Sequence, residues 1–383
     1  MPVCLVLPGS AVSTAVTGQA IPGKQTSLIS TFLLVVATMP RHRIWHRQHR
    51  SAGPAPQDRF FRCPLHLGCH LAAGMLVMLT GCADTTRLTI ESLTLSETRP
   101  FPQSSEGKPV VISGELTLPS EATGRVPAVI LAHGCGGFGR VQEASWTHEL
   151  NRMGFASFSL DSFGGRGIRE VCSWQEHINV GSRLLDAYRA LEALAAHPRI
   201  DPSRIALMGF SHGGMVALWA HYTRFQRRWM SGQHRFAAYL SFYPAVCNFR
   251  FLDEDQDSRP LRIFLGADDD YNSVAQCQEY VERIRAAGSD VALLVYPDAR
   301  HAFDAPELPP LQYLPQNVNS RACRYVERPD GSLAGFSVDT GRPVTRDAPC
   351  ISRGTARGYN PRAHRQAIQD VNAFLNAAFG MTR

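Results

Sequence analysis

Residues 206–218 read ALMGFSHGGMVAL, and they place a serine between glycines where a strand pattern gives way to a helix pattern. Gly209 and Gly213 flank Ser211 at positions where a Cβ atom would crowd a tight strand-to-helix turn. Such a turn projects the serine hydroxyl beyond the carboxyl end of its strand, where ligands of a parallel sheet bind. The G-x-S-x-G spacing therefore predicts that Ser211 is a nucleophile.

A serine hydroxyl is a weak nucleophile unless a base takes its proton, and the base needs a carboxylate to orient it. Two later strand ends offer these groups. Three carboxylates, Asp268–Asp270, end the run 261–270, and His301 follows the apolar run 291–297. With this kind of turn the acid and the histidine come after the serine in that order. We therefore expect His301 to be the base and one of the three aspartates to be its acid.

An acyl transfer also needs two N–H donors for the oxyanion that forms on the carbonyl group. We expect the first from the backbone of His212, directly after the serine. We expect the second from the glycine-rich turn after the apolar run 127–133, with the backbone N–H groups of Cys135 and Gly136 as candidates. Four features placed independently along the chain thus indicate the same acyl-transfer chemistry.

A parallel sheet would hold these groups together. Period-2 alternation in 87–95 and 110–118 predicts an antiparallel hairpin or edge strands. Continuous apolar runs, typical of strands covered on both faces, occur at 127–133, 155–161, 204–210, 236–243, 261–267 and 291–297. Helical patterns lie between them, most clearly at 181–197, 273–288 and 360–379. The alternation predicts an α/β fold, a mostly parallel doubly wound sheet flanked by helices.

Residues from about 100 to 380 resemble the dienelactone hydrolase family of the α/β-hydrolase superfamily. The likeness is carried by LDSFGGRG, DAYRALEAL, RIALMGFSHGG, GADDDYNSVAQC and RHAFD. The family's Gly-x-x-Asp signature falls on Gly266–Asp269, so the resemblance implies Asp269 as the acid beside Ser211 and His301. The namesake enzymes use a cysteine nucleophile. The serine here therefore favours ordinary serine esterase chemistry on a carboxylic ester or lactone.

Two other functions stay open. A peptidase of the prolyl-oligopeptidase type shares this catalytic half, but it would normally bring an N-terminal propeller, and the first residues contain no strand repeats to build one. A non-catalytic binding protein on the same fold is the other alternative, and the complete Ser-Asp-His set argues against it.

Further ligands are suggested only weakly. Arg166, in GGRG after a strand end, is a candidate substrate-binding residue for a carboxylate, although a solvated loop arginine is an equally good interpretation. The sequence contains no HExxH, Walker A or paired CxxC motif, so we expect no metal and no cofactor. The expected partner is a small-molecule ester.

The positive charge of the chain lies at its N-terminus. The 383 residues are 44% hydrophobic and carry a formal net charge of +6. Residues 1–81 hold seven basic residues against the single acid Asp58, and the remainder has 32 residues of each sign. The charge therefore gives no support to nucleic-acid binding by the folded part.

The same N-terminal region is typical of a targeting sequence. RHRIWHRQHR is basic, and the apolar LGCHLAAGMLVMLTGC that follows is shorter than a membrane span, which is the order of a secretory signal. Its ending Leu79–Cys82 resembles the lipobox of bacterial lipoproteins. We expect 1–81 to be a leader and the exported protein to be periplasmic or membrane-anchored through a lipid on Cys82. A cytoplasmic protein with an untargeted extension, or a signal at 28–39, is the alternative.

Six cysteines remain beyond Cys82, and an even count in an exported chain predicts disulfides. They are Cys135, Cys172, Cys247, Cys277, Cys323 and Cys350. Cys247 and Cys277 form one expected pair, because both lie near strand ends on the catalytic side of the predicted sheet.

Residues 303–359 interrupt the alternation within a single α/β domain over 82–383. They are rich in Pro, Gly, Asp and Arg, and so long a stretch without an obvious element is usually a functional loop or a disordered one. Because the stretch begins directly after His301, we expect it to leave from the catalytic edge and to form a lid. A disulfide between Cys323 and Cys350 would hold that lid.

Overall fold

The computed structural model describes residues 84–96, 106–172, 177–330, 332–337, 341, 343–345 and 348–381. The expected leader over 1–81, the alternative signal at 28–39 and the candidate lipidation residue Cys82 lie outside the described residues. Within them, no helix has both the length and the apolar character needed to cross a membrane.

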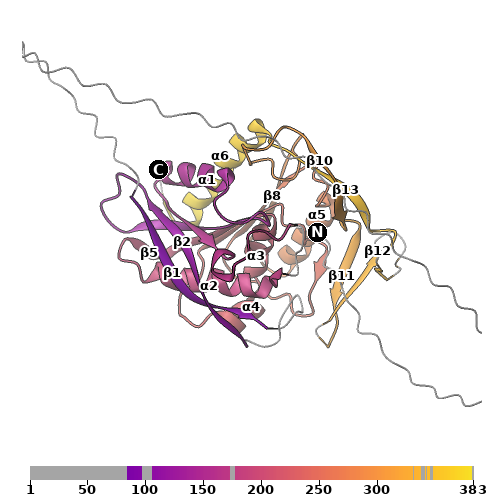
Figure 1. Ribbon diagram of the computed structural model, residues 1–383, viewed down its shortest axis with the longest axis horizontal. Coiled ribbons are helices and arrows are strands. Elements are labelled where there is room, and N and C mark those ends of the chain that lie inside the picture. Colours follow the sequence, from indigo (N-terminus) through magenta and orange to yellow (C-terminus); the bar gives the residue numbers. More distant parts are fainter. Residues whose placement is uncertain are drawn as a thin grey trace, which may run out of the picture. The chain divides into compact units, whose positions relative to one another are not determined.

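An eight-stranded sheet forms the centre of the fold (Figure 1), with strand order β1-β2-β4-β3-β5-β6-β8-β9. The strands are β1 (Asp84–Leu95), β2 (Gly107–Leu118), β3 (Val126–Ala132), β4 (Ala156–Asp161), β5 (Ile200–Phe210), β6 (Ala238–Phe242), β8 (Leu261–Gly266) and β9 (Val291–Tyr296). β2 runs antiparallel to β1 and β4, whereas each of the other neighbouring pairs is parallel. The mostly parallel sheet predicted from the sequence is confirmed, including its antiparallel edge pair.

The position of each strand follows its hydrophobic pattern. β1 lies at the sheet edge beside β2, and it alternates buried with more exposed residues from Thr89 to Leu93. β4 and β6 lie inside the sheet and are buried at every residue, as expected for strands covered on both faces. Parallel strands covered in this way bring their carboxyl ends to one edge of the sheet, where a site can be assembled.

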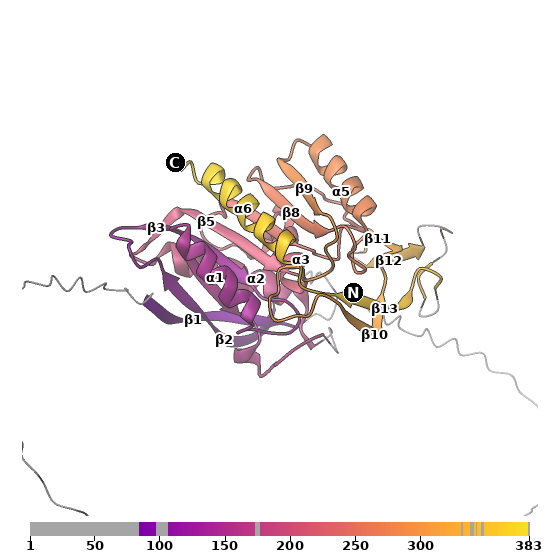
Figure 2. The same cartoon turned by 90° about the horizontal axis from the view of Figure 1, so that it is seen from above.

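Helices cover both faces of this sheet. They are α1 (Val141–Arg152), α2 (Val180–Ala195), α3 (His212–Ala220), α4 (Thr223–Trp229), α5 (Val274–Ala286) and α6 (Pro361–Ala378), with the 3-10 turn η1 (Gly164–Arg166). Figures 1 and 2 show α1 and α6 side by side on one face, and the rings of Trp146 and His364 join them. α2, α3 and α4 lie on the other face. Asn179, Ser273 and Asn360 cap α2, α5 and α6 with their side chains, which fixes where these helices begin.

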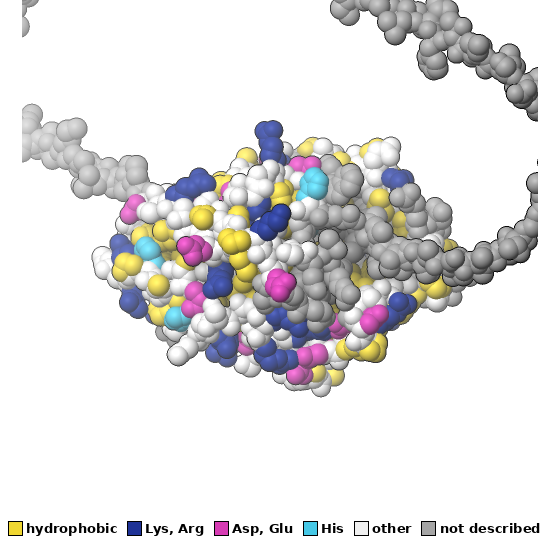
Figure 3. Space-filling view, turned by 60° about the horizontal axis from the view of Figure 1, so that its bottom comes forward, with side chains coloured by type: hydrophobic (Ala, Val, Ile, Leu, Met, Phe, Trp, Pro, Cys, Tyr) yellow, Lys and Arg dark blue, Asp and Glu magenta, His cyan; other side chains and the backbone are white. Residues whose placement is uncertain are grey.

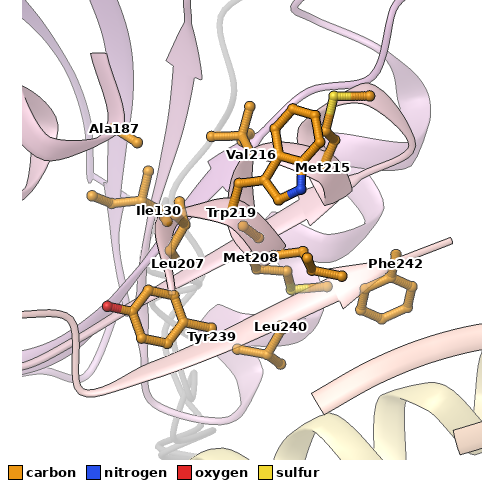
Figure 4. Packing of buried hydrophobic residues seen from close by; sticks show 14 of the residues in the cluster. Ile130, Ala187, Leu207, Met208, Met215, Val216, Trp219, Tyr239, Leu240 and Phe242 are labelled. Carbon is orange, nitrogen blue, oxygen red and sulfur yellow. The ribbon is translucent and has the colours of Figure 1, made fainter. Parts of the chain in front are cut away.

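The core beneath the serine turn is tightly filled (Figure 4). α3 has buried residues on every side, since it lies between the sheet and α2. Met215, Val216 and Trp219 of α3 belong to one buried hydrophobic cluster with Leu207 and Met208 of β5 and Leu240 and Phe242 of β6. Close packing of this kind resists displacement, so the turn that precedes α3 has a rigid base.

The stretch 303–359 contains four strands, so the prediction that it lacks regular elements is wrong. β10 (Gln312–Asn319) pairs with β13 (Ser352–Arg357), and β11 (Cys323–Glu327) pairs with β12 (Leu333–Ser337) and with the short β7 (Phe249–Arg250). The strands were missed because β10 and β13 are mostly polar and partly exposed, so they show no apolar alternation. Their hydrogen-bond partners also lie far away in the sequence.

Charged side chains of both signs are interspersed over the described part of the face in Figure 3. Exposed ion pairs include Arg227 with Asp253 and Arg262 with Asp290. Each such pair contributes about 0–1 kcal/mol. The stability of the fold therefore comes mainly from its buried core.

Candidate active site

Ser211 stands on the turn between β5 and α3. Its backbone has φ 52° and ψ −111°, a conformation that residues with a side chain rarely adopt. A Cβ atom on Gly209 would lie 2.0 Å from the carbonyl oxygen of Gly213, and one on Gly213 would lie 1.9 Å from that of Ala132. Both positions therefore require glycine, which explains in physical terms the spacing found in the sequence.

Ser211, His301 and Asp269 lie next to one another. His301 Nε2 is 3.0 Å from Ser211 Oγ, and His301 Nδ1 is 3.0 Å from Asp269 Oδ2. The three residues come from the turns after β5, β8 and β9, at the carboxyl edge of the sheet. Because an ionised carboxylate only accepts hydrogen bonds, the proton of the imidazole is on Nδ1. Nε2 is then free to accept the proton of the serine hydroxyl.

The turn after β8 holds the carboxylate of Asp269 in one orientation. Its Oδ1 accepts hydrogen bonds from the backbone N–H groups of Tyr271 at 2.7 Å and Asn272 at 3.1 Å. Its Oδ2, which faces His301, also accepts one from Asn272 Nδ2 at 3.0 Å. Asp268 is exposed, and the Asp270 carboxylate accepts a hydrogen bond from the backbone N–H of Ala356 instead. Asp269 is thus the aspartate of this run that contacts the histidine.

The glycine-rich turn after β3 lies against the serine. A Cβ atom on Gly134 would be 3.8 Å from Ser211 Cβ, so the segment with Cys135 and Gly136 begins beside the hydroxyl. The carbonyl group of Cys135 accepts a hydrogen bond from Val171 N at 2.8 Å, which fixes the peptide. His212 is the first residue of α3, where a backbone N–H has no acceptor within the helix. Both segments expected to supply N–H donors therefore adjoin Ser211.

Two tyrosine rings flank the imidazole of His301. The ring of Tyr271 lies 4.3 Å and that of Tyr243 lies 4.7 Å from it, centroid to centroid. The hydroxyl group of Tyr243 donates to Asp304, a buried carboxylate that also accepts from Trp146 Nε1 at 2.7 Å. The supporting roles of Tyr243, Tyr271 and Asp304 were not predicted from the sequence. The only available signal was the position of Asp304 in RHAFD, three residues after the histidine.

Strands of the stretch 303–359 also contact the turn that carries the acid. Asn319 Nδ2 donates to the carbonyl group of Asp270 at 2.8 Å, and the Thr355 hydroxyl donates to Tyr271 Oη at 2.7 Å. Close by, Gly358 N donates to the carbonyl group of His301 at 3.1 Å. This stretch therefore packs against the acid and the histidine.

Three disulfides lie within the part of the chain that the structure describes. Cys323 is bonded to Cys350 and Cys247 to Cys277, the two pairs expected from the sequence, and Cys135 is bonded to Cys172. The third pair ties the turn after β3 to the segment after η1. Structural disulfides are typical of proteins that fold in oxidising compartments, so these bonds indicate a location outside the cytoplasm.

Arg166 has no N–H group left for a substrate carboxylate, contrary to the expectation from its place after a strand. Its guanidinium forms a buried ion pair with Asp186, and the side chain is 3% exposed. The remaining N–H groups donate to Thr94 Oγ1 and to the carbonyl oxygens of Leu93 and Ser162. All five donors are thus used within the fold, where they fasten β1 to α2. The interpretation as a solvated loop arginine is also wrong.

In the part of the chain that the structure describes, no group of three or more His, Cys, Asp or Glu side chains is arranged to hold a metal ion.

A mostly parallel sheet with a strained serine turn and a histidine–aspartate pair at its carboxyl edge defines an α/β-hydrolase. The sequence model of the dienelactone hydrolase family matches residues 112–329, more than half of the chain. The protein belongs to this family and is a hydrolase that acts on ester bonds. No curated protein sequence is significantly similar to the chain.

The first of three similar solved structures supports the fold. A dienelactone hydrolase-like promiscuous phosphotriesterase from metagenomic libraries superposes with a TM-score of 0.50 at 15% identity, covering 77% of this chain and 98% of that one. A dienelactone hydrolase of Klebsiella pneumoniae has a TM-score of 0.47 at 15% identity, with coverages of 76% and 98%. An esterase of the planctomycete Thermogutta terrifontis has a TM-score of 0.40 at 15% identity, with coverages of 55% and 84%.

Proposed function

We propose that the protein is a serine esterase that cleaves a small carboxylic ester or lactone through an acyl-enzyme on Ser211. The observation that carries the proposal is a series of two contacts of 3.0 Å each. One joins Ser211 Oγ to His301 Nε2, and the other joins His301 Nδ1 to Asp269 Oδ2. A cysteine, the nucleophile of the namesake enzymes, is replaced here by a serine whose proton has an acceptor.

The proposed reaction has two halves. Ser211 Oγ attacks the ester carbonyl while His301 Nε2 takes its proton, and the oxyanion is bound by the N–H groups of His212 and of Cys135 or Gly136. The imidazolium formed is stabilised by Asp269, and it gives the proton to the leaving alcohol. Water, activated by the same imidazole, then attacks the acyl group and releases the acid.

Covalent labelling tests the proposal. A fluorophosphonate probe is expected to label Ser211 in the wild-type protein, located by peptide mass spectrometry, and to leave Ser211→Ala unlabelled. Hydrolysis of p-nitrophenyl esters of graded chain length is expected to fall on the order of 10⁴–10⁶-fold in the variant. Ser157→Ala is the control, because Ser157 is also buried but lies on β4. Near wild-type hydrolysis by Ser211→Ala would reject the mechanism.

We infer that the stretch 303–359 bounds the substrate cleft and acts as its lid. Its contacts with Asp270 and Tyr271 and its start after His301 support this placement. A lid held by Cys323–Cys350 would select esters by size. A double variant, Cys323→Ser/Cys350→Ser, with an unchanged preference among esters of different size would contradict this role.

We also propose that the protein is exported and anchored by a lipid on Cys82. The Leu-Thr-Gly-Cys ending after a basic and apolar stretch supports it, and so do the three disulfides. Mass spectrometry of membrane-extracted protein from its host should find a diacylglyceryl group on Cys82. A soluble product with a free Cys82 thiol would reject the proposal.

A further inference from the structure

Arg183 lies in the first turn of α2 and is only 1% exposed. Its Nη1 donates to His212 Nδ1 at 2.6 Å, and its Nη2 donates to the carbonyl oxygen of His133 at 2.7 Å. A guanidinium presents its donors in a rigid planar fork, so it holds two acceptors at a fixed separation. One buried side chain thus joins the end of β3 to the start of α3.

These two acceptors belong to the segments that adjoin Ser211. His212 follows the serine directly, and His133 begins the turn that leads to Cys135 and Gly136. A shift of either segment would change the separation of their backbone N–H groups. Donors that bind an oxyanion must be held at hydrogen-bonding distance before the reaction.

The guanidinium also brings a positive charge that no direct ion pair neutralises. Asp186 pairs with Arg166, and among the described residues no ion pair includes Arg183. Burial lowers the pKa of Arg183 to about 10, so the group stays protonated at neutral pH. The centre of the Phe163 ring lies 5.0 Å from the guanidinium carbon, so an aromatic face packs against the charge.

We propose that Arg183 is the positioning residue of the oxyanion hole. It fixes His212 and His133 so that the N–H groups of the two segments converge on one point beside Ser211 Oγ. The inference rests on the proposed acyl-enzyme function. Arg183 does not touch the substrate, since it acts through the two histidines.

Kinetics of Arg183→Met test this role. We expect kcat to fall about 10–100-fold with little change in KM. A trifluoromethyl ketone with the acyl chain of the best ester substrate forms an adduct with Ser211 that carries an oxyanion. We therefore expect its affinity to fall by the same factor as kcat. Affinity for the carboxylic acid product should be unchanged. Arg183→Lys keeps the charge but cannot bridge both acceptors, so most of the loss is expected there too. Arg189→Met, on the same helix, is the control.

A second route covers the case in which Arg183→Met does not fold. In His212→Asn the amide oxygen of the side chain can still accept a hydrogen bond from Arg183. In His212→Leu the side chain at this position offers no acceptor. We expect His212→Leu to lose at least several-fold more activity than His212→Asn. If Arg183→Met folds, combining it with His212→Leu should add little, because Arg183→Met has already removed the hydrogen bond to His212.

Three results would overturn the inference. They are additive losses in the double variant, wild-type activity of Arg183→Lys, and equal losses of affinity for the ketone and the acid product. Failure of the proposed function is a different outcome. There the wild-type protein itself would neither hydrolyse esters nor react with the fluorophosphonate.

Discussion

Glu143 offers a direct test of how the turn before α1 is held. The residue lies in the first turn of α1, is 4% exposed, and accepts a hydrogen bond from the backbone N–H of Gly139 at 3.1 Å. Burial raises the pKa of Glu143 from 4.5 to about 8, although the Gly139 bond and the Arg183 charge oppose the shift. The carboxyl group is therefore protonated in the folded protein at neutral pH.

The sign of the pH effect follows from the two states. Between pH 4.5 and about 8 the folded protein keeps a proton on Glu143 that the unfolded chain has lost. The stability that this group contributes is therefore fully present below the unfolded pKa and is lost as the pH rises through the folded pKa. At about 1.4 kcal/mol per pH unit, the interval sets an upper limit of about 5 kcal/mol on the loss.

Glu143→Gln should remove this pH dependence. The amide oxygen can still accept the Gly139 N–H, but the side chain no longer titrates. Its extra N–H donors cost free energy at every pH, roughly 1–3 kcal/mol if unpaired, so the useful quantity is the pH dependence. We expect the free energy of unfolding of the wild type, relative to the variant, to fall by about 2–5 kcal/mol from acidic to mildly alkaline pH.

Urea unfolding of the oxidised protein at several pH values measures this difference, because other titrating groups cancel between the two proteins. Glu149→Gln removes a carboxylate from the same helix at a less buried position and serves as the control. If the stability curves of the wild type and Glu143→Gln run parallel, burial does not hold the proton on Glu143.

Three further changes have defined outcomes. Gly213→Ala should abolish ester hydrolysis and cost roughly 1–3 kcal/mol or more in urea unfolding, because its Cβ would lie 1.9 Å from a backbone oxygen. Cys323→Ser/Cys350→Ser should lower the free energy of unfolding by about 3–4 kcal/mol, the chain-entropy value for a loop of this length. Asp269→Asn should lower kcat on the order of 10³–10⁴-fold, whereas Asp270→Asn should mainly lower the melting temperature.

Much of the sheet could be predicted because its information is local. Continuous apolar runs identified β3, β4 and β5, and period-2 alternation identified the edge strands β1 and β2. By contrast, α1 was missed, since its residues VQEASWTHELNR show only a weak apolar stripe. Packing against α6 stabilises it instead, through contacts such as that of Trp146 with His364. Such long-range contacts leave no local pattern.

The residues that meet at the site could also be predicted from local sequence patterns. A glycine on either side of Ser211 and polar residues after two later strands predicted which side chains would meet. The supporting residues were not predictable, because their partners come from other elements. Arg183 lies in an amphipathic helix with nothing to distinguish it from a surface arginine, and Arg166 was misread for the same reason. A buried arginine is recognised by its acceptors, which only the fold supplies.

The position of the stretch 303–359 limits how it could move as a lid. Opening that displaced β10 or β13 as a whole would break the hydrogen bonds of Asn319 and Thr355 to the turn of Asp269, and so disturb the acid itself. Catalysis requires that turn to stay in place while substrate enters. The movement of the proposed lid would therefore be confined to parts beyond these anchors. Leu311, which directly precedes β10 and is 58% exposed, lies beyond these anchors.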